Sequence, residues 1–483
     1  AWLAARYWAL PPSADYAFAV ARPWIPALGI EYRIGIDGVS LIMILLTALL
    51  TPICVLASWH EIRARRKEFM ALLLLVGVGV NGAFAALDLF LFYIFWEVML
   101  IPMYFLVGMW GGPKRIPAAM KFLLYTMVGS VLMLVALLYL YFAGGKTFNL
   151  LALYGTVLSP TIQCWLFAAF ALAFAIKVPL FPFHTWLPDA HTEAPTAGSI
   201  LLAGVFLKVG VYGFYRFAMP LFPDAVLWFR PAILVLSVVG IVGGALVSMV
   251  QPEVKRLIAY SSVSHLGFVM LGLFALTPEG VQGAVIQMLN HGLSTGALFL
   301  LFGMLYERSH QREIAAYGGL AKRLPLFAAC FLVVSLSSIG LPGLNNFVGE
   351  FLILLGTFRA EPVYGAVAAF GVVLGAVYLL WLVERVFFGP EPSAGDAGHA
   401  PAWRDLGVRE GIAVLPLIAL CLWLGIAPGG VLARTLPSAT AFLRFVEKGI
   451  APVPPIESVG LFSPPLSTGV GLFSRELSTG ARR

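Results

Sequence analysis

The amino-acid sequence predicts an all-α fold, a polytopic membrane protein with about 12 transmembrane helices in this chain. Hydrophobic residues make up 60% of the 483 residues and charged residues only 11%, against roughly 25% in an ordinary soluble protein. The mean hydropathy is +0.92. A soluble fold needs more polar residues than this to cover its surface. The composition therefore excludes a soluble enzyme, a disordered protein and a nucleic-acid binder.

Apolar runs of the length that spans a bilayer, about 20 residues, recur along the whole chain. They predict membrane spans at residues 39–59, 68–87, 88–110, 118–142, 161–185, 195–216, 229–251, 256–275, 280–305, 324–357, 362–388 and 408–428. Residues 1–38 are rich in Pro and aromatic residues and predict an extramembrane N-terminal segment. Residues 39–67 are expected to form a peripheral transmembrane helix and its loop.

Lysines and arginines gather in alternate loops between the predicted spans. The basic residues of one set of loops are Arg63, Arg65, Arg66, Lys67, Lys114, Arg115, Lys255, Arg256, Arg308, Arg312, Lys322, Arg323, Arg385, Arg404 and Arg409. The intervening loops carry Lys146, Arg216, Arg230 and Arg359. Because basic residues favour the cytoplasmic side of a membrane, we expect the first set of loops to face the cytoplasm.

Two of the predicted spans contain helix-breaking residues. Residues 174–188 read FAIKVPLFPFHTWLP, and residues 339–351 read IGLPGLNNFVGEF. Proline removes a helical hydrogen bond, and a break at membrane depth is tolerated only where it is buried in protein or lines a wet cavity. Broken helices at corresponding positions are typical of transporters built from two repeats. We therefore predict two inverted five-helix repeats, residues 68–216 and 217–388.

The remainder of the chain is expected to contribute little to these repeats. Residues 389–450 predict a loop, a last transmembrane helix and a terminal segment. Residues 451–483 predict a flexible tail, because they are rich in Ser, Gly and Pro. Within the tail, GLFSPPLSTG at 460–469 recurs as GLFSRELSTG at 471–480.

Six ionisable side chains lie deep inside the predicted spans, where a charge costs about 2.5–3.5 kcal/mol on insertion scales. They are Glu97, Lys177, Lys208, His265, His291 and Glu350. Each has a structural alternative, as a buried group that is simply hydrogen-bonded. Taken together, carboxylates, lysines and imidazoles at membrane depth are the residue types that a proton relay needs, because each can hold or release a proton. We expect Glu97 to pair with a buried lysine.

The sequence contains no motif that predicts a cofactor site in this chain. The cysteines Cys54, Cys164, Cys330 and Cys421 lie singly in apolar runs, without metal-ligand spacing, and are expected to be small core residues. There is no glycine-rich phosphate-binding motif. We expect neither a metal nor a redox cofactor in this chain.

Several segments resemble the antiporter-like membrane subunits of proton-pumping NADH:quinone oxidoreductase, respiratory complex I. They are FWEVMLIPMYFLVGMWGG (95–112), AIKVPLFPFHTWLPDAHTEAPTAGSILLAGVFLKVG (175–210), KRLIAYSSVSHLGF (255–268) and NFVGEFLILLG (346–356). The likeness extends from about residue 20 to residue 428. Glu350 follows the pattern of the M-type, or mitochondrial subunit 4 type, members, where the L- and N-type members carry Lys.

The resemblance implies a role for each buried ionisable group. Glu97 would be the carboxylate that modulates Lys177, the lysine on the first broken helix. Lys208 would bridge two half-channels. The two histidines would continue the hydrophilic axis to Glu350, the exit-side acid.

The resemblance also implies partners and a location. The chain would sit in a bacterial inner (plasma) membrane, among lipids, between L-type and N-type neighbours and with a peripheral redox arm. FMN and iron–sulfur clusters would belong to partner subunits, so the chain would be a non-redox subunit of a translocase. Family members have fourteen transmembrane helices, and the chain begins with Ala1 rather than Met. We therefore expect two further helices before it.

Three other interpretations remain open from the sequence. The first is the large subunit of a multi-subunit sodium/proton antiporter, which shares these motifs, although a Lys at position 350 would favour it more. The second is the equivalent subunit of a membrane-bound hydrogenase or a ferredoxin-oxidising complex. The third is a scaffold that conducts nothing, which the buried ionisable residues disfavour.

Overall fold

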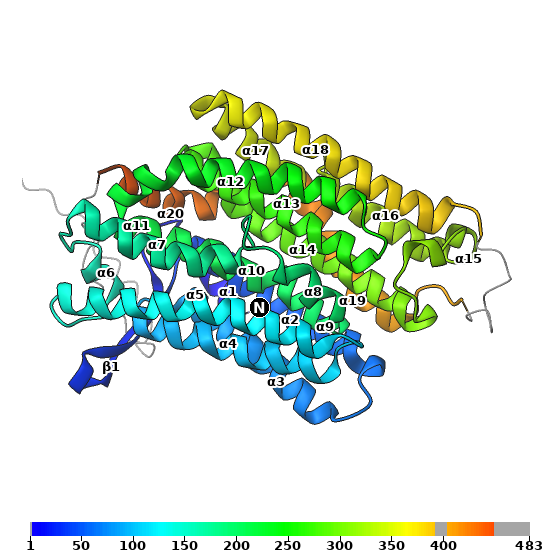
Figure 1. The fold of residues 1–483 in the computed structure, drawn as a ribbon, viewed down its shortest axis with the longest axis horizontal. Coiled ribbons are helices and arrows are strands. Elements are labelled where there is room, and N and C mark those ends of the chain that lie inside the picture. The colour runs from blue at the N-terminus through cyan, green and yellow to red at the C-terminus, as the bar shows by residue number, and fades with distance from the viewer. Residues whose placement is uncertain (1, 392–402, 449–483) are drawn as a thin grey trace, which may run out of the picture.

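Long helices that run roughly side by side make up most of the protein, as the computed structural model shows for residues 2–391 and 403–448 (Figure 1). Among these described residues, 11 helices are long and apolar enough to cross a membrane. A shorter apolar helix, α16 (Pro325–Ile339), joins them. Together they account for the twelve predicted spans, so the prediction of a polytopic helical membrane protein is confirmed.

Helix α2 precedes the helices of the first half, which run from α3 to α11. Their bounds are α2 (Gly38–Glu61), α3 (Arg66–Ala85), α4 (Leu89–Trp110), α5 (Arg115–Ala143), α6 (Leu150–Leu153), α7 (Pro160–Lys177), α8 (Trp186–Glu193), α9 (Thr196–Leu201), α10 (Leu207–Gly213) and α11 (Met219–Leu221). Two π-helical turns, η2 (Leu202–Phe206) and η3 (Phe214–Ala218), join α9, α10 and α11 into one continuous span.

The second half repeats this order of long helices. Its elements are α12 (Pro223–Met249), α13 (Val254–Ala275), α14 (Pro278–Ser309), η4 (Ile314–Ala316), α15 (Leu320–Arg323), α16, α17 (Asn345–Ala360), α18 (Pro362–Val383), η5 (Glu384–Phe388), α19 (Val408–Ile426) and α20 (Gly429–Lys448). Several helices start with proline at the first position, which needs no N–H there. Examples are α7, α12 and α14.

Both predicted helix breaks are present, and each falls in the fourth span of its half. Helix α7 ends at Lys177 and α8 begins at Trp186, while α16 ends at Ile339 and α17 begins at Asn345. The spans before them are α3, α4 and α5 in the first half and α12, α13 and α14 in the second. Because each half has five spans, an odd number, the second half enters the membrane from the opposite side. This order agrees with two inverted repeats.

The N-terminal segment departs from a purely helical fold. After a short helix, α1 (Trp2–Trp8), strands β1 (Ala17–Ile25) and β2 (Ile30–Ile36) pair antiparallel. A 3₁₀ turn, η1 (Pro26–Leu28), connects them, and Gly29 has a φ of 62°, a conformation that glycine adopts without strain. The β-hairpin lies at one end of the bundle (Figure 1).

The two ends of the bundle differ in what they carry. The hairpin end holds β1, β2, α6 and α11, and the opposite end holds α15 (Figure 1). Loops rich in basic residues lie at that opposite end. One of them is joined to the end of α8 by the ion pair between the Arg312 guanidinium and Glu193. We call this end of the bundle the basic end. The predicted tail, residues 451–483, and residues 392–402 lie outside the described part of the chain.

Burial is greatest in three spans, the last span of the first repeat and two spans of the second repeat. The span Thr196–Leu221 is entirely buried inside the protein, and α13 and α14 are almost so. The other spans expose apolar side chains on about half of their surface or more, as helices do that face lipid or neighbouring proteins. Figure 1 shows α13 and α14 in the middle of the bundle, between α3 at one edge and α18 at the other.

Asp88 joins the hairpin to helix α4 at the hairpin end. Its carboxylate accepts hydrogen bonds from the backbone N–H groups of Phe90 and Leu91, both at 3.0 Å, and caps α4. It also accepts one from the N–H of Glu31, at 3.3 Å. Burial raises the pKa of Asp88 from 3.8 to about 6, although these backbone hydrogen bonds lower it in part. The folded protein therefore holds this proton more tightly than the unfolded chain.

The replacement Asp88→Asn should make the protein more heat-stable than the parent at pH 8. A raised folded-state pKa stabilises the fold only at low pH, and this contribution is lost as the pH rises through about 6. Asn caps a helix as well as Asp does and carries no charge to bury. Thermal unfolding in detergent at pH 4 and pH 8 measures the effect, with the exposed Asp15→Asn as control. A parent that is more stable than Asp88→Asn at pH 8 contradicts it.

Candidate functional site

The two helix breaks deliver charged side chains to the interior of the bundle. The break after α7 leaves Lys177 at the C-terminal end of the helix, where the helix dipole favours a cation. Trp186 closes the break, because its indole N–H donates to the free carbonyl of Ile176 at 2.9 Å. In the second half, Gly340 and Gly343 have φ values of 84° and 93°, which a turn of this kind requires of glycine.

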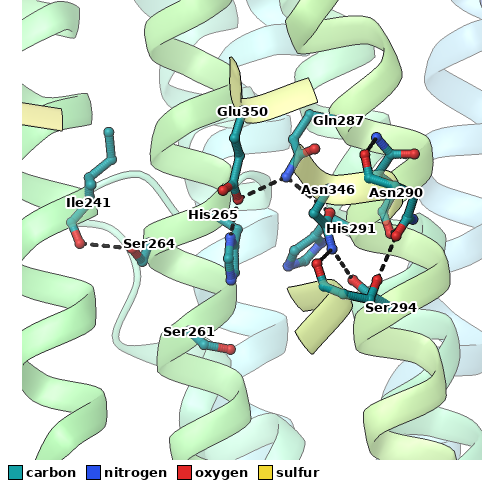
Figure 2. A network of polar contacts seen from close by, with 12 residues as sticks. Ile241, Ser261, Ser264, His265, Gln287, Asn290, His291, Ser294, Asn346 and Glu350 are labelled. Atoms are coloured by element: carbon teal, nitrogen blue, oxygen red, sulfur yellow. Dashed lines mark hydrogen bonds and ion pairs between the residues drawn. The ribbon is translucent and has the colours of Figure 1, made fainter. Parts of the chain in front are cut away.

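Four of the six predicted residues form one continuous chain of close contacts. The ammonium of Lys208 lies 2.7 Å from Nδ1 of His291. The rings of His291 and His265 have centroids 5.5 Å apart. Nδ1 of His265 lies 2.9 Å from a carboxylate oxygen of Glu350. Figure 2 shows His265 and Glu350 pointing toward each other, with His291 beside them. This series of contacts thus links the buried span Thr196–Leu221 through α14 and α13 to α17.

The π-helical turn η2 positions Lys208. Its ammonium donates to the backbone carbonyl of Ala203, which lies inside that turn. A π-helical turn shifts the backbone hydrogen bonds from i−4 to i−5, and such turns are frequent at functional sites. The side chain is completely buried. Lys208 therefore depends on this carbonyl and on His291 for its polar contacts.

Amide side chains surround the Glu350 end of the chain. The amide N–H₂ of Gln287 donates to Glu350 and to Asn346, both at 3.1 Å. Asn346 in turn donates to the hydroxyl of Ser294 at 2.8 Å, and Figure 2 shows these groups side by side. The side-chain amide of Asn290 donates to the carbonyl of Asn345 at 2.7 Å. The hydrogen bond from Gln287 stabilises the Glu350 carboxylate, and the asparagines hold Gln287 and the start of α17 in place around it.

Gln287 and the paired asparagines are functional candidates that the sequence reasoning did not single out. A signal was present, because Gln287 precedes His291 by four residues and so shares its helix face. Asn345 and Asn346 open the helix that follows the second break. Tyr378 was also missed, and its hydroxyl lies 3.4 Å from Nε2 of His265. An isolated tyrosine in an apolar run gives no comparable signal.

Lys177 and Glu97 stand apart from this chain. The Lys177 ammonium lies over the rings of Trp96 at 4.1 Å and Phe206 at 3.7 Å, contacts that attract a cation. It has no hydrogen-bond partner among the described residues, and neither does Oε1 of Glu97. The expected pairing of Glu97 with a buried lysine is therefore not a direct contact in this structure. Instead, the ammonium contacts the faces of the two aromatic rings.

Within residues 2–391 and 403–448, no group of three or more His, Cys, Asp or Glu side chains is placed to hold a metal ion. The four cysteines are unpaired there, and Cys54 and Cys421 are buried. The chemistry that this site offers is proton transfer, since lysine, imidazole and carboxylate groups in contact can pass a proton from one to the next.

Comparisons with known proteins agree with this geometry. Residues 86–375 match the family described as NADH:quinone oxidoreductase/Mrp antiporter, transmembrane. NADH-quinone oxidoreductase subunit M of Rickettsia prowazekii is 44% identical over 421 residues, which cover 86% of this chain and 84% of the relative. NADH-ubiquinone oxidoreductase chain 4 of Marchantia polymorpha is 43% identical, with coverage of 86% and 83%.

Solved structures show the same fold. A chain of respiratory complex I from Thermus thermophilus with bound NADH matches with a TM-score of 0.85 and 37% identity, over 92% of each chain. A chain of the Mrp complex from Dietzia sp. DQ12-45-1b shares the fold, with a TM-score of 0.76 and 24% identity over 89% of each chain. The family match covers more than half of this chain, and the curated relatives exceed 40% identity over most of it. This chain belongs to the NADH:quinone oxidoreductase/Mrp antiporter membrane subunit family.

Proposed function

We propose that this chain is a proton-translocating membrane subunit of an NADH:quinone oxidoreductase, and that protons move along Lys208, His291, His265 and Glu350. One observation carries the proposal. These four side chains are buried at the centre of a membrane-spanning bundle and are joined by contacts of 2.7 Å and 2.9 Å on either side of a histidine pair. The family match and the names of the relatives support the same function.

The energetics favour a relay over a scaffold. An ionisable group at membrane depth costs about 2.5–3.5 kcal/mol on insertion scales. A scaffold of apolar helices would avoid this cost by carrying leucine or alanine at these positions. The chain instead keeps Lys177, Lys208 and Glu350 in the interior and provides donors and acceptors for the last two.

The finer parts of the proposal rest on the resemblance and on the relatives' names. In this proposal Glu97 acts on Lys177 through its charge rather than through a direct contact. FMN and iron–sulfur clusters belong to partner subunits of a peripheral arm, and L-type and N-type subunits are the lateral neighbours. The chain then sits in a bacterial plasma membrane and binds no redox cofactor of its own.

We expect Glu350→Gln to lower NADH-driven proton pumping by at least about tenfold, because a positioned proton-transfer group contributes about 10²–10⁴-fold. Glutamine has the same shape but cannot ionise. Pumping is measured in closed membrane vesicles with a potential-sensitive dye. The exposed Glu384→Gln, a carboxylate on the neighbouring element η5, is the matched control. Wild-type pumping in Glu350→Gln contradicts the relay.

Lys177→Ala and Glu97→Gln should each abolish most NADH-dependent quinone reduction that is coupled to pumping, since they remove the charges that act on each other. The control is Lys121→Ala. Lys121 forms a partly exposed ion pair with Asp189 at 2.8 Å, and such pairs contribute about 0–1 kcal/mol. Full pumping in either interior variant removes this pair from the mechanism.

The attached redox module is identified by purification through a tag on this chain. Flavin and iron–sulfur subunits that co-purify with NADH:quinone activity support the proposal. Small membrane subunits alone, with sodium flux and no iron, point instead to a sodium/proton antiporter.

A further inference from the structure

A second group of buried charged side chains lies at the basic end, outside the relay. Glu61, the last residue of α2, is at its centre. One of its carboxylate oxygens, Oε1, accepts hydrogen bonds from the backbone N–H and the hydroxyl of Thr196, both at 3.1 Å. Thr196 is the first residue of α9, and the preceding Pro195 offers no side-chain cap. Glu61 therefore caps, from a distant helix, the span that carries Lys208.

The other carboxylate oxygen of Glu61 is available for proton chemistry. Oε2 is buried and has no hydrogen-bond partner in the described part of the chain. Nearby carboxylates are paired with arginine: Glu193 with Arg312 at 3.1 Å, Glu410 with Arg308 at 2.7 Å and Glu307 with Arg409 at 3.8 Å. Within residues 2–391 and 403–448, no ion pair involves Glu61. In this respect Glu61 differs from Glu193, Glu307 and Glu410.

The surroundings of Glu61 combine charge with access to water. Charged side chains from four helices lie near this end of α2: Arg66 of α3, Lys255 of α13, Glu307 and Arg308 of α14, and Arg409 and Glu410 of α19. The Lys255 ammonium donates to the carbonyl of Ala194 at 2.7 Å. A cavity of about 10 Å³, lined in part by Thr196, Glu307 and Glu410, lies beside this group and has room for about one water molecule.

Polar atoms lead from Glu61 toward Lys208. Ser58 lies three residues before Glu61, on the same helix face, and its buried hydroxyl has no partner within the described ranges. His191 is completely buried, and neither ring nitrogen has a partner among those residues. Its ring stacks on Phe299, with centroids 4.6 Å apart and planes 6° apart. The hydroxyl of Ser199, on the helix that Glu61 caps, donates to the backbone carbonyl of His191 at 3.2 Å, so His191 lies beside the span that carries Lys208.

Buried polar atoms of this kind normally bind ordered water, because leaving them unpaired is costly. We propose that Glu61 is the acid through which protons enter the relay from the basic end, by way of His191 and water to Lys208. This inference rests on the proposed function. A hydrated proton from the solution at the basic end bonds to Oε2 and leaves a water molecule behind, and neutral Glu61 then gives the proton through water to one ring nitrogen of His191. The imidazole releases the proton on its other nitrogen to the neutral amine of Lys208.

The test is Glu61→Gln in the complete complex. Glutamine retains an oxygen that accepts from Thr196, so the cap on α9 is kept, but it cannot carry a proton. We expect NADH-driven pumping to fall by about tenfold or more, while NADH oxidation with a water-soluble acceptor and thermal stability stay as in the parent. Glu61→Asp should recover part of the pumping. The exposed Glu68→Gln, at the same end of the bundle, is the matched control and should pump normally.

His191→Phe provides an independent measurement. Phenylalanine retains the stacking on Phe299 and removes both ring nitrogens, which have no protein partner in the described ranges. It should lower pumping as Glu61→Gln does, and it decides the question if Glu61→Gln does not assemble. Normal pumping in an assembled Glu61→Gln or His191→Phe complex overturns the inference. A parent complex that oxidises NADH but moves no protons overturns the proposed function itself, so the two failures are distinguishable.

Discussion

A lysine that is completely buried at the centre of a membrane-spanning bundle needs polar partners, and the geometry of the site follows from this need. Lys208 takes the carbonyl of Ala203 and a ring nitrogen of His291. The carbonyl is accessible because η2 is π-helical, so the backbone N–H four residues on is not its partner. His291 then packs against His265, which contacts Glu350. One buried cation thus requires a series of polar groups that runs through three helices.

Different interactions stabilise the buried charges in the two halves of the protein. A cation is attracted to aromatic faces, so Lys177 rests between Trp96 and Phe206 without a hydrogen bond among the described residues. A carboxylate needs donors, and Glu350 receives one from Gln287. The second half is therefore polar and continuous, whereas no hydrogen bond among the described residues joins Lys177 to Lys208.

Much of the fold was predictable from the sequence, because spans depend on runs of apolar residues and breaks depend on Pro and Gly. The six interior ionisable residues were predictable for the same reason, as exceptions to an apolar pattern. The contacts between them were not, since they depend on helix rotation. That the Lys177 ammonium lies over the rings of Trp96 and Phe206, without a hydrogen bond to Glu97, was not predictable either. The π-helical turns beside Lys208 have no signature in periodicity, and Glu61 is hidden among the surface charges of a helix end.

The proposed proton path has a carboxylate at each end and basic side chains between them, so the protonation of each group depends on the charges of its neighbours. From Glu61 through His191, Lys208 and the histidine pair to Glu350, each interior base lies close to another positive or protonatable group. Like charges in a buried site oppose one another, so the protonation of one group depends on the charge of the next. A change in the charge of Lys255 then alters how readily His191 accepts a proton. Distant chemistry can act on this subunit through such changes in charge, provided that a contiguous set of groups transmits them.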